Sequence, residues 1–262
     1  MRDITPDVER MAKELGGTVS VAVRNIDNAF DFSFNDEARV GSASTIKVPI
    51  LLEALRQARD GVLSLDKDHA ITADQRCDGS GVLRHMRDGL VVTIRDLLTL
   101  MIIVSDNTAT NILIDIVGID KVNSTLRGFG YTSTTLMRKM YDWDGIARGR
   151  NNFVVAREMA DLLARIARHD ALGGEWDELI MSVLGKQMFQ DELGLLLPDG
   201  VLANKTGQVD GVVNDCGVVT TERFRYSIAV FTKDAPCPGE AKVMIGRISK
   251  VIYDAVGAGK SC

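Results

Sequence analysis

A serine and a lysine three residues apart, Ser44 and Lys47, have the types and spacing needed for nucleophilic catalysis. Residues 44–58 show helical periodicity, and positions i and i+3 share one helix face, so the hydroxyl and the amine can meet. A lysine whose amine is withdrawn from water can take the serine proton. The free N–H groups of a helix start also favour developing negative charge. The alternative is a helix cap followed by a surface lysine, because Ser-x-x-Lys occurs about once by chance in a chain this long.

A second polar group, Ser105-Asp106-Asn107, lies between two apolar helical stretches. Taken alone, the triplet is typical of a helix N-cap. In a catalytic interpretation, Ser105 passes a proton to the leaving nitrogen and Asn107 holds a substrate amide, while Asp106 fixes the backbone of the turn.

A third group, Lys205-Thr206-Gly207, falls on a predicted strand. Lys205 supplies positive charge, Thr206 offers a hydroxyl to a substrate carboxylate, and Gly207 lets a substrate backbone approach an edge strand closely. The backbone N–H groups of Gln208 and Ser44 are the expected oxyanion donors. Each group alone has an ordinary structural interpretation, but the chance of all three in this order is on the order of 10⁻³. We therefore combine them into one site.

The overall composition is that of a globular chain, with 262 residues, 45% of them hydrophobic, and a formal net charge of −5. This acidic balance, without a Lys/Arg run, argues against a nucleic-acid partner. The apolar runs are shorter than the roughly 18 residues of a membrane span. The N-terminus has no secretory core, so we expect a cytoplasmic protein, or a periplasmic or secreted one whose leader has been removed. The three histidines and four cysteines lack metal-ligand spacing, and we expect no metal and no cofactor.

Strand signals lie at both ends of the chain and helical signals in its middle. Strands are predicted over 18–24, 29–34, 201–205, 215–221 and 225–232. Helices are predicted over 5–16, 44–58, 93–104, 107–117, 119–128, 154–168 and 239–256, with one or two short ones in 181–194.

This distribution predicts an α+β fold, in which the terminal helices flank an antiparallel sheet and an all-helical subdomain is inserted. We expect residues 1–41 and 195–262 to form the sheet subdomain and residues 42–194 the helical one. The active site then lies between the two. No apolar interface stripe is evident, so a monomer is expected.

The ordered set S-x-x-K, S-D-N and K-T-G resembles the signature of class A β-lactamases and related penicillin-binding proteins, over nearly the whole chain. The resemblance implies the same sheet-plus-helical architecture and no cofactor. Its implied roles are those of a serine hydrolase that opens the cyclic amide C–N bond of a β-lactam. They are nucleophile for Ser44, base for Lys47, proton shuttle for Ser105, electrostatic anchor for Lys205, and substrate binding for Asn107 and Thr206.

The chain departs from this pattern in the loop over residues 138–152, where class A enzymes carry E-x-x-L-N, whose Glu activates the hydrolytic water. The loop here contains no Glu and is a few residues short; by the resemblance, Arg138 matches the Arg that opens it. Asp142 is a candidate water-activating base, because geometry comes before residue type; a salt bridge or cap is the alternative. Asn214-Asp215 stands where many relatives have an Arg, and Ser80 where they often have an aromatic residue, which suggests a wider pocket.

Three functions besides β-lactam hydrolysis stay open at this point. A penicillin-binding-protein-like peptidase would act on D-Ala-D-Ala peptides and release penicillin slowly. A related esterase or amidase would have another natural substrate. A covalent β-lactam sensor is disfavoured, since the sequence offers no membrane segment or appended domain. The substrate in each case is a small molecule or short peptide.

Overall fold

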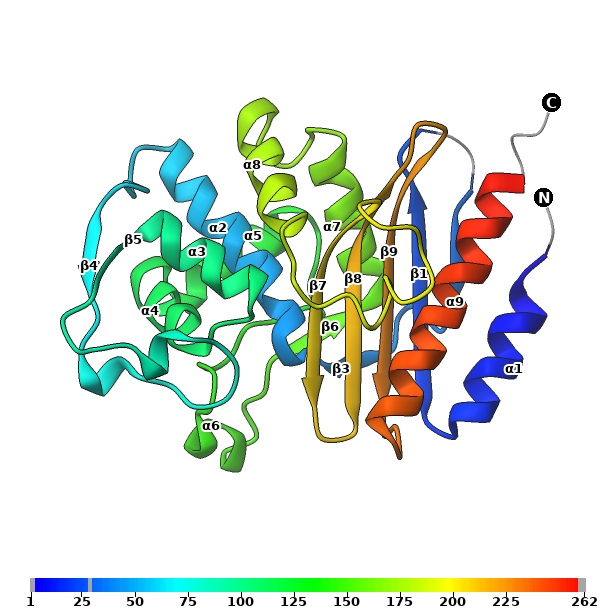
Figure 1. The fold of residues 1–262 in the computed structure, drawn as a ribbon, viewed down its shortest axis with the longest axis horizontal. Helices are drawn as coiled ribbons and strands as arrows, with labels where there is room; N and C mark the ends of the chain where they lie inside the picture. Colours follow the sequence, from blue (N-terminus) through cyan, green and yellow to red (C-terminus); the bar gives the residue numbers. More distant parts are fainter. Residues whose placement is uncertain (1–2, 28–29, 259–262) are drawn as a thin grey trace.

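A computed structural model of the chain describes residues 3–27 and 30–258. Its centre is a five-stranded antiparallel sheet with the strand order β2-β1-β9-β8-β7 (Figure 1). The strands are β1 (Thr18–Asn25), β2 (Phe32–Phe34), β7 (Leu202–Val209), β8 (Val212–Thr220) and β9 (Arg225–Lys233). Both ends of the chain therefore contribute to one sheet, and the predicted α+β class is confirmed.

The sheet joins the two ends of the sequence through the pairing of β1 with β9. Val21 lies opposite Val230, and both side chains are fully buried. The predicted strand over residues 29–34 begins in the structure only at Phe32, and Ala29 lies outside the described residues.

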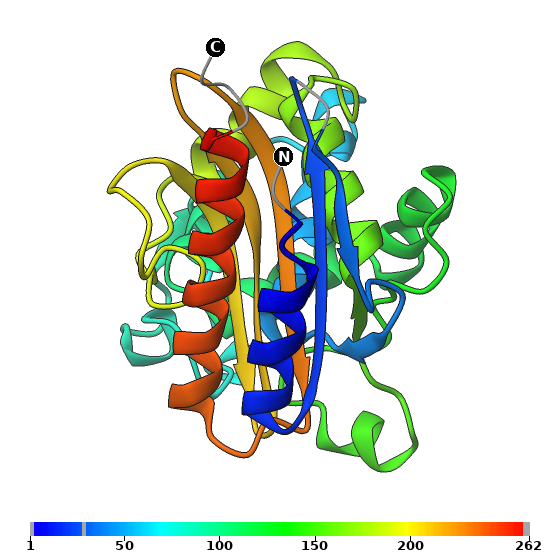
Figure 2. The same ribbon diagram turned by 90° about the vertical axis from the view of Figure 1, so that its right-hand side faces the viewer.

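Helices cover both faces of this sheet. On one face, α1 (Thr5–Leu15) and α9 (Pro238–Ala258) lie side by side, as Figure 2 shows. Their apolar side chains form one core with those of the sheet, since Val8, Met11, Ile245 and Ile248 are all buried. On the other face, α7 (Ala156–Ala167) packs against β1 and β9. Although α7 falls within residues 42–194, its contacts tie it to the sheet.

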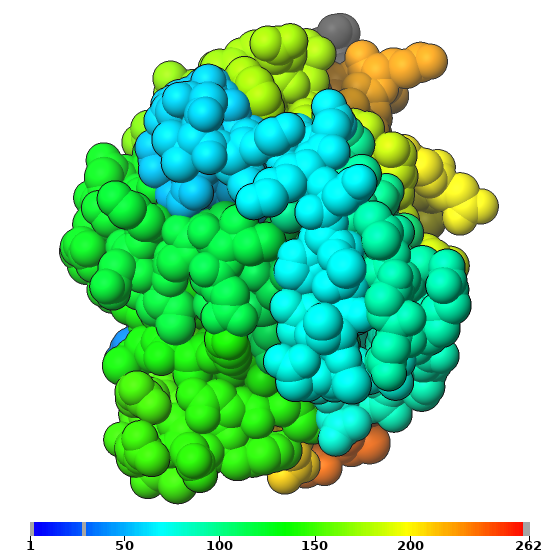
Figure 3. Space-filling view, turned by 90° about the vertical axis from the view of Figure 1, so that its left-hand side faces the viewer, coloured from blue at the N-terminus to red at the C-terminus, as the bar shows by residue number. Residues whose placement is uncertain are grey.

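The helix α2 (Lys47–Arg59) is buried along nearly its whole length. It packs against α3 (Ile94–Ile103), α4 (Asn107–Val117), α5 (Ile119–Gly128) and α8 (Gly174–Leu184). The short helix α6 (Trp143–Ala147) lies at the lower edge of this region in Figure 1. Short strand pairs join β3 (Arg39–Gly41) to β6 (Phe153–Val155) and β4 (Asp68–Ala70) to β5 (Val91–Thr93). In Figure 3 the cyan segment that carries β4 covers part of the outer face of this region. None of the described helices has the length and apolarity to span a bilayer.

The prediction of short helices in residues 181–194 was wrong. The helix α8 begins earlier, at Gly174, and ends at Leu184, after which the chain runs in turns as far as β7. Asp177 explains the early start, because its buried carboxylate accepts hydrogen bonds from the backbone N–H groups of Ala171, Leu172 and Gly173. A carboxylate inside the first turn stabilises the free N–H end of a helix.

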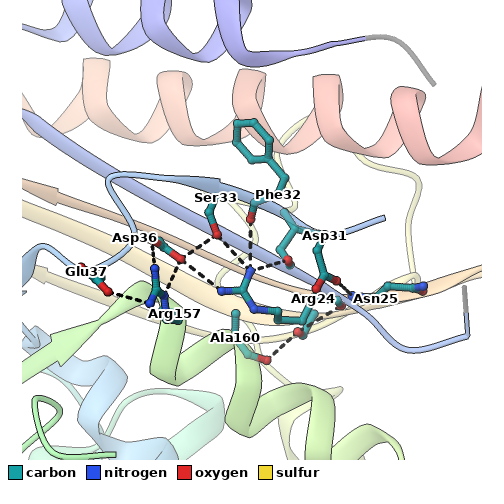
Figure 4. Close-up of polar contacts among 11 residues, drawn as sticks. Arg24, Asn25, Asp31, Phe32, Ser33, Asp36, Glu37, Arg157 and Ala160 are labelled. Atoms are coloured by element: carbon teal, nitrogen blue, oxygen red, sulfur yellow. Dashed lines mark hydrogen bonds and ion pairs between the residues drawn. The ribbon is translucent and has the colours of Figure 1, made fainter. Parts of the chain in front are cut away.

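A buried aspartate, Asp36, ties the segment before β3 to the sheet and to α7 (Figure 4). Its carboxylate accepts hydrogen bonds from Ser33 Oγ at 2.6 Å, Arg24 Nη2 at 3.1 Å and Arg157 Nε at 3.0 Å. Burial opposes ionisation of this carboxyl group, but the hydrogen bonds from Arg157, Ser33 and Arg24 outweigh it and lower the pKa of Asp36 to about 2.

Asp36→Ala is expected to lower the free energy of unfolding at pH 7 by about 2–3 kcal/mol, because two arginines lose a shared, buried partner. Since the folded pKa is lowered, this contribution is present above the unfolded pKa of about 4 and is lost as the pH falls toward 2. Urea denaturation at pH 7 and pH 3 measures the difference. Glu37→Ala is the matched control: Glu37 also pairs with Arg157 but is exposed, and should contribute less than about 0.5 kcal/mol. Equal losses for the two variants would contradict this account.

Candidate active site

Ser44 lies in a 3₁₀ turn, Ala43–Ile46, which leads directly into α2. The backbone of Ala43 has a positive φ of 43°, and this left-handed residue turns the chain out of the sheet segment β3 into the helix. Ser44 is half-buried, whereas Thr45 and Ile46 beside it are buried. The serine is thus held at the start of a buried helix, with its own side exposed to a cleft.

Lys47 is fully buried one turn further on, and its ammonium group is held by three acceptors. Nζ donates to the Ser105 carbonyl oxygen at 2.8 Å, to Ser105 Oγ at 2.9 Å and to Asn107 Oδ1 at 2.9 Å. The first two sequence motifs are therefore in direct contact. The interpretation of Lys47 as a surface lysine does not hold.

The surroundings of Lys47 favour the neutral amine. Burial lowers the pKa of Lys47 well below its usual value of 10.5, and the positive charge of Lys205 lowers it further. An amine whose pKa is lowered in this way gives up its proton more readily, and its free lone pair can act as a general base.

The turn before α4 presents Ser105 to this amine. Ser105 adopts a left-handed conformation with φ 55°, and Asp106 is the residue that caps α4, accepting from Ala109 N at 3.0 Å. The second oxygen of Asp106 accepts from Val82 N at 2.7 Å and Leu83 N at 2.9 Å. Asp106 is thus structural, and it fixes the strained backbone that directs Ser105 toward Lys47.

The third motif lies on β7, the edge strand of the sheet that borders the Ser44 turn. Lys205 is fully buried, and its Nζ donates to the Thr206 carbonyl oxygen at 2.7 Å. Burial lowers the pKa of Lys205 to about 8, although the charge of Asp215 opposes the shift. A Cβ atom on Gly207 would lie 2.8 Å from Ser44 N, so only glycine allows the strand to approach the serine this closely.

These elements enclose a cleft of about 320 Å³. Its lining residues are Ser44, Ser80, Ser105, Phe189, Asp191, Glu192, Thr206, Gly207, Gln208 and Lys242. Of the predicted residues, Lys47 and Lys205 are fully buried and are not among those that line the cleft. Asn107 is engaged with the protein, since its Nδ2 donates to the Asp78 carbonyl oxygen at 2.9 Å.

The structure places Asp142 elsewhere. Its carboxylate caps the short helix α6 and accepts from Gly145 N at 2.8 Å, and it is not among the residues that line the cleft. The loop is fixed to α4 at Met140, whose backbone N and O both bond to the side chain of Asn111. Arg138 braces the loop through Asn151, with Nη2 to Oδ1 at 2.8 Å.

Four residues that sequence reasoning missed also line the cleft: Phe189, Asp191, Glu192 and Lys242. The first three lie in the turns after α8, a stretch for which the pattern predicted helix, and Lys242 lies on α9. Asp191 and Glu192 lie in a turn and carry no periodic signal, and Phe189 and Lys242 belong to none of the three motifs, so the sequence alone offered no means of finding them.

A serine that lines a cleft, followed one helical turn later by a buried lysine with a lowered pKa, is the arrangement of a serine hydrolase that works by acyl transfer. Among the described residues, no group of three or more His, Cys, Asp or Glu side chains is placed to hold a metal ion. The chain belongs to the β-lactamase enzyme family, whose sequence model matches residues 3–256.

Individual relatives agree with this assignment over nearly the full chain. A β-lactamase from Sphaerobacter thermophilus has 32% sequence identity and a TM-score of 0.92, with 98% of this chain and 99% of that one covered. A β-lactamase from Proteus vulgaris is 26% identical over 257 residues, covering 95% of this chain and 94% of the relative. The solved structure of PBP-A shares the fold, with 24% identity and a TM-score of 0.88 over 98% of each chain. The predicted resemblance is confirmed, and the chain is a serine β-lactamase-like hydrolase.

Proposed function

We propose that Ser44 attacks the β-lactam carbonyl and forms an acyl-enzyme, which water then hydrolyses. Lys47 takes the hydroxyl proton, and Ser105 delivers a proton to the ring nitrogen as the C–N bond breaks. The backbone N–H groups of Ser44 and Gln208 stabilise the oxyanion. Thr206 and Lys205 bind the substrate carboxylate.

The observation that carries this proposal is the set of hydrogen bonds around Lys47. A fully buried amine, three residues after Ser44, is bonded to Ser105 Oγ and to Asn107 Oδ1, and it therefore links the helix that follows the nucleophile to the turn of the shuttle. Burial of this amine disfavours its charged form, which is the property that a general base requires.

A second candidate function is that of a penicillin-binding protein, which would keep the acyl group. One observation favours it: the carboxylate of Asp142 is occupied by Gly145 N. For Asp142 to activate the hydrolytic water, it would have to release that N–H group and turn into the cleft. In both candidates the partner is a small β-lactam or a D-Ala-D-Ala-type peptide, and we propose a monomer.

Incubation with excess nitrocefin is expected to give sustained turnover of many equivalents per enzyme, as a hydrolase requires. Progress curves together with intact-mass spectra measure both the turnover and the acyl-enzyme. Asp142→Asn should leave the turnover rate within about twofold of wild type, since the carboxylate serves as a helix cap, and one cap contributes about 1 kcal/mol to stability.

A burst of one equivalent with no further hydrolysis would favour the penicillin-binding function. Accumulation of acyl-enzyme only in the Asp142→Asn variant would instead assign Asp142 as the base.

A further inference from the structure

Two consecutive acidic residues, Asp191 and Glu192, line the same cleft as Ser44. Glu192 is only 2% exposed, whereas the Asp191 side chain is about half exposed, at 53%. Lys242, on α9, binds both carboxyl groups, with Nζ 2.5 Å from Asp191 Oδ2 and 3.2 Å from Glu192 Oε1. The mechanism proposed for Ser44 uses none of these three groups.

The second oxygen of Glu192 is the unusual atom of this cluster. Among the described residues, Oε2 is buried without a hydrogen-bond partner, which is a costly state for a carboxylate oxygen. The side chains of Asp191 and Glu192 are nevertheless close enough to hydrogen-bond each other. Two ionised carboxylates cannot form such a bond, but a protonated Glu192 can donate to Asp191.

The charged groups around Glu192 come from three elements besides its own. Lys205 of β7 and Asp215 of β8 interact with it electrostatically, and Lys242 of α9 binds it directly. Burial raises the pKa of Glu192 to about 8, and the charge of Asp215 adds to the shift. Burial also raises the pKa of Asp215 to about 7. Whatever the charge state of these neighbours, ionisation of Glu192 adds one negative charge to the cluster.

That extra charge would lie beside Lys205, the proposed anchor for the substrate carboxylate. We propose that the Asp191–Glu192 pair determines the specificity of the cleft for the charge of its substrate. While the two carboxyl groups share a proton, the cleft binds anionic β-lactams, and once that proton is lost, the cleft repels them. This inference rests on the proposed function and adds the charge state of the preferred substrate. Asp191 and Glu192 act through the local field and make no contact with the reacting bond.

The test compares wild type with Glu192→Gln, which mimics the protonated side chain at every pH. The second-order rate constant for acylation is measured at pH 6 and pH 9.5 with benzylpenicillin, an anion, and with its neutral methyl ester. At pH 6 the two proteins should agree within about twofold for both substrates. At pH 9.5 the variant should react about tenfold faster than wild type with the anion and equally fast with the ester, as expected for removal of one nearby charge.

Lys205 and Asp215 titrate in both proteins, so their contributions largely cancel in the comparison. Glu240→Gln is the matched control, because it removes the same charge from an exposed position on α9 and should change neither rate by more than about twofold. A variant with the same pH profile as wild type, or one that is slower with both substrates at both pH values, would overturn the inference. If neither substrate acylates the wild-type protein, the proposed function itself would be overturned.

Discussion

Ser44→Ala is expected to abolish covalent labelling by a fluorescent penicillin, with no acyl adduct in the intact-mass spectrum. The substitution removes the only atom of the residue that can attack a carbonyl carbon, and a neighbouring hydroxyl cannot take its place, because geometry and the nearby base set nucleophilicity. Ser44 is half-buried and lies in the first turn, so the loss of one hydroxyl should change the unfolding midpoint little.

Ser80→Ala supplies the matched control for this experiment. Ser80 lines the same cleft, but its contact with the catalytic turn is through the backbone, since its carbonyl oxygen accepts from Asn107 N at 3.0 Å. This variant should be labelled to the same stoichiometry as wild type. Labelling of Ser44→Ala at full stoichiometry would sink the assignment of the nucleophile.

Lys47→Met should slow acylation of Ser44 by about 10³-fold, within the usual range for loss of a general base. Methionine fills much of the same volume and removes a buried amine, so the fold should survive. However, Ser105 Oγ and Asn107 Oδ1 each lose a donor, at about 1 kcal/mol or more apiece. Stopped-flow labelling gives the rate, and a thermal melt checks the fold.

The pH profile separates the base from a merely structural lysine. Because burial and Lys205 lower the pKa of Lys47, acylation by wild type should rise as the amine loses its proton and level off well below pH 10.5. Lys47→Met should lose that rise, and Lys47→Arg, which stays charged and cannot accept a proton, should also be slow. If Lys47→Arg acylates at the wild-type rate, the amine is not the base.

The helices and strands that carry the three motifs were predictable from the sequence because each is long and strongly patterned. The helices α4 and α5 begin and end where periodicity placed them, and Asp106 provides the cap for α4. The three motifs also follow one another in the order expected of a single site. Contact between Lys47 and the Ser105 turn could be inferred from this order. The three hydrogen bonds of that contact depend on side-chain packing, which sequence periodicity does not predict.

What escaped prediction was mostly short or irregular. The strands β3, β4, β5 and β6 have three residues each, too few to show an alternating pattern. The cap formed by Asp142 on α6 depends on a five-residue helix with no apolar stripe. Lys242 and Glu192 are fifty residues apart in sequence, and only the packing of α9 against the sheet brings them together.

The pairing of β1 with β9 has a consequence for how the enzyme is made. Val21 meets Val230 only after some 200 intervening residues have been synthesised, so the sheet closes late and at a substantial cost in loop entropy. The turn that carries Ser44 leaves the ribosome early, but the strand that carries Gly207 can pack against it only within the finished sheet. If the proposed mechanism holds, a nascent chain has its nucleophile long before it has an oxyanion site, and catalytic competence arrives in one late step.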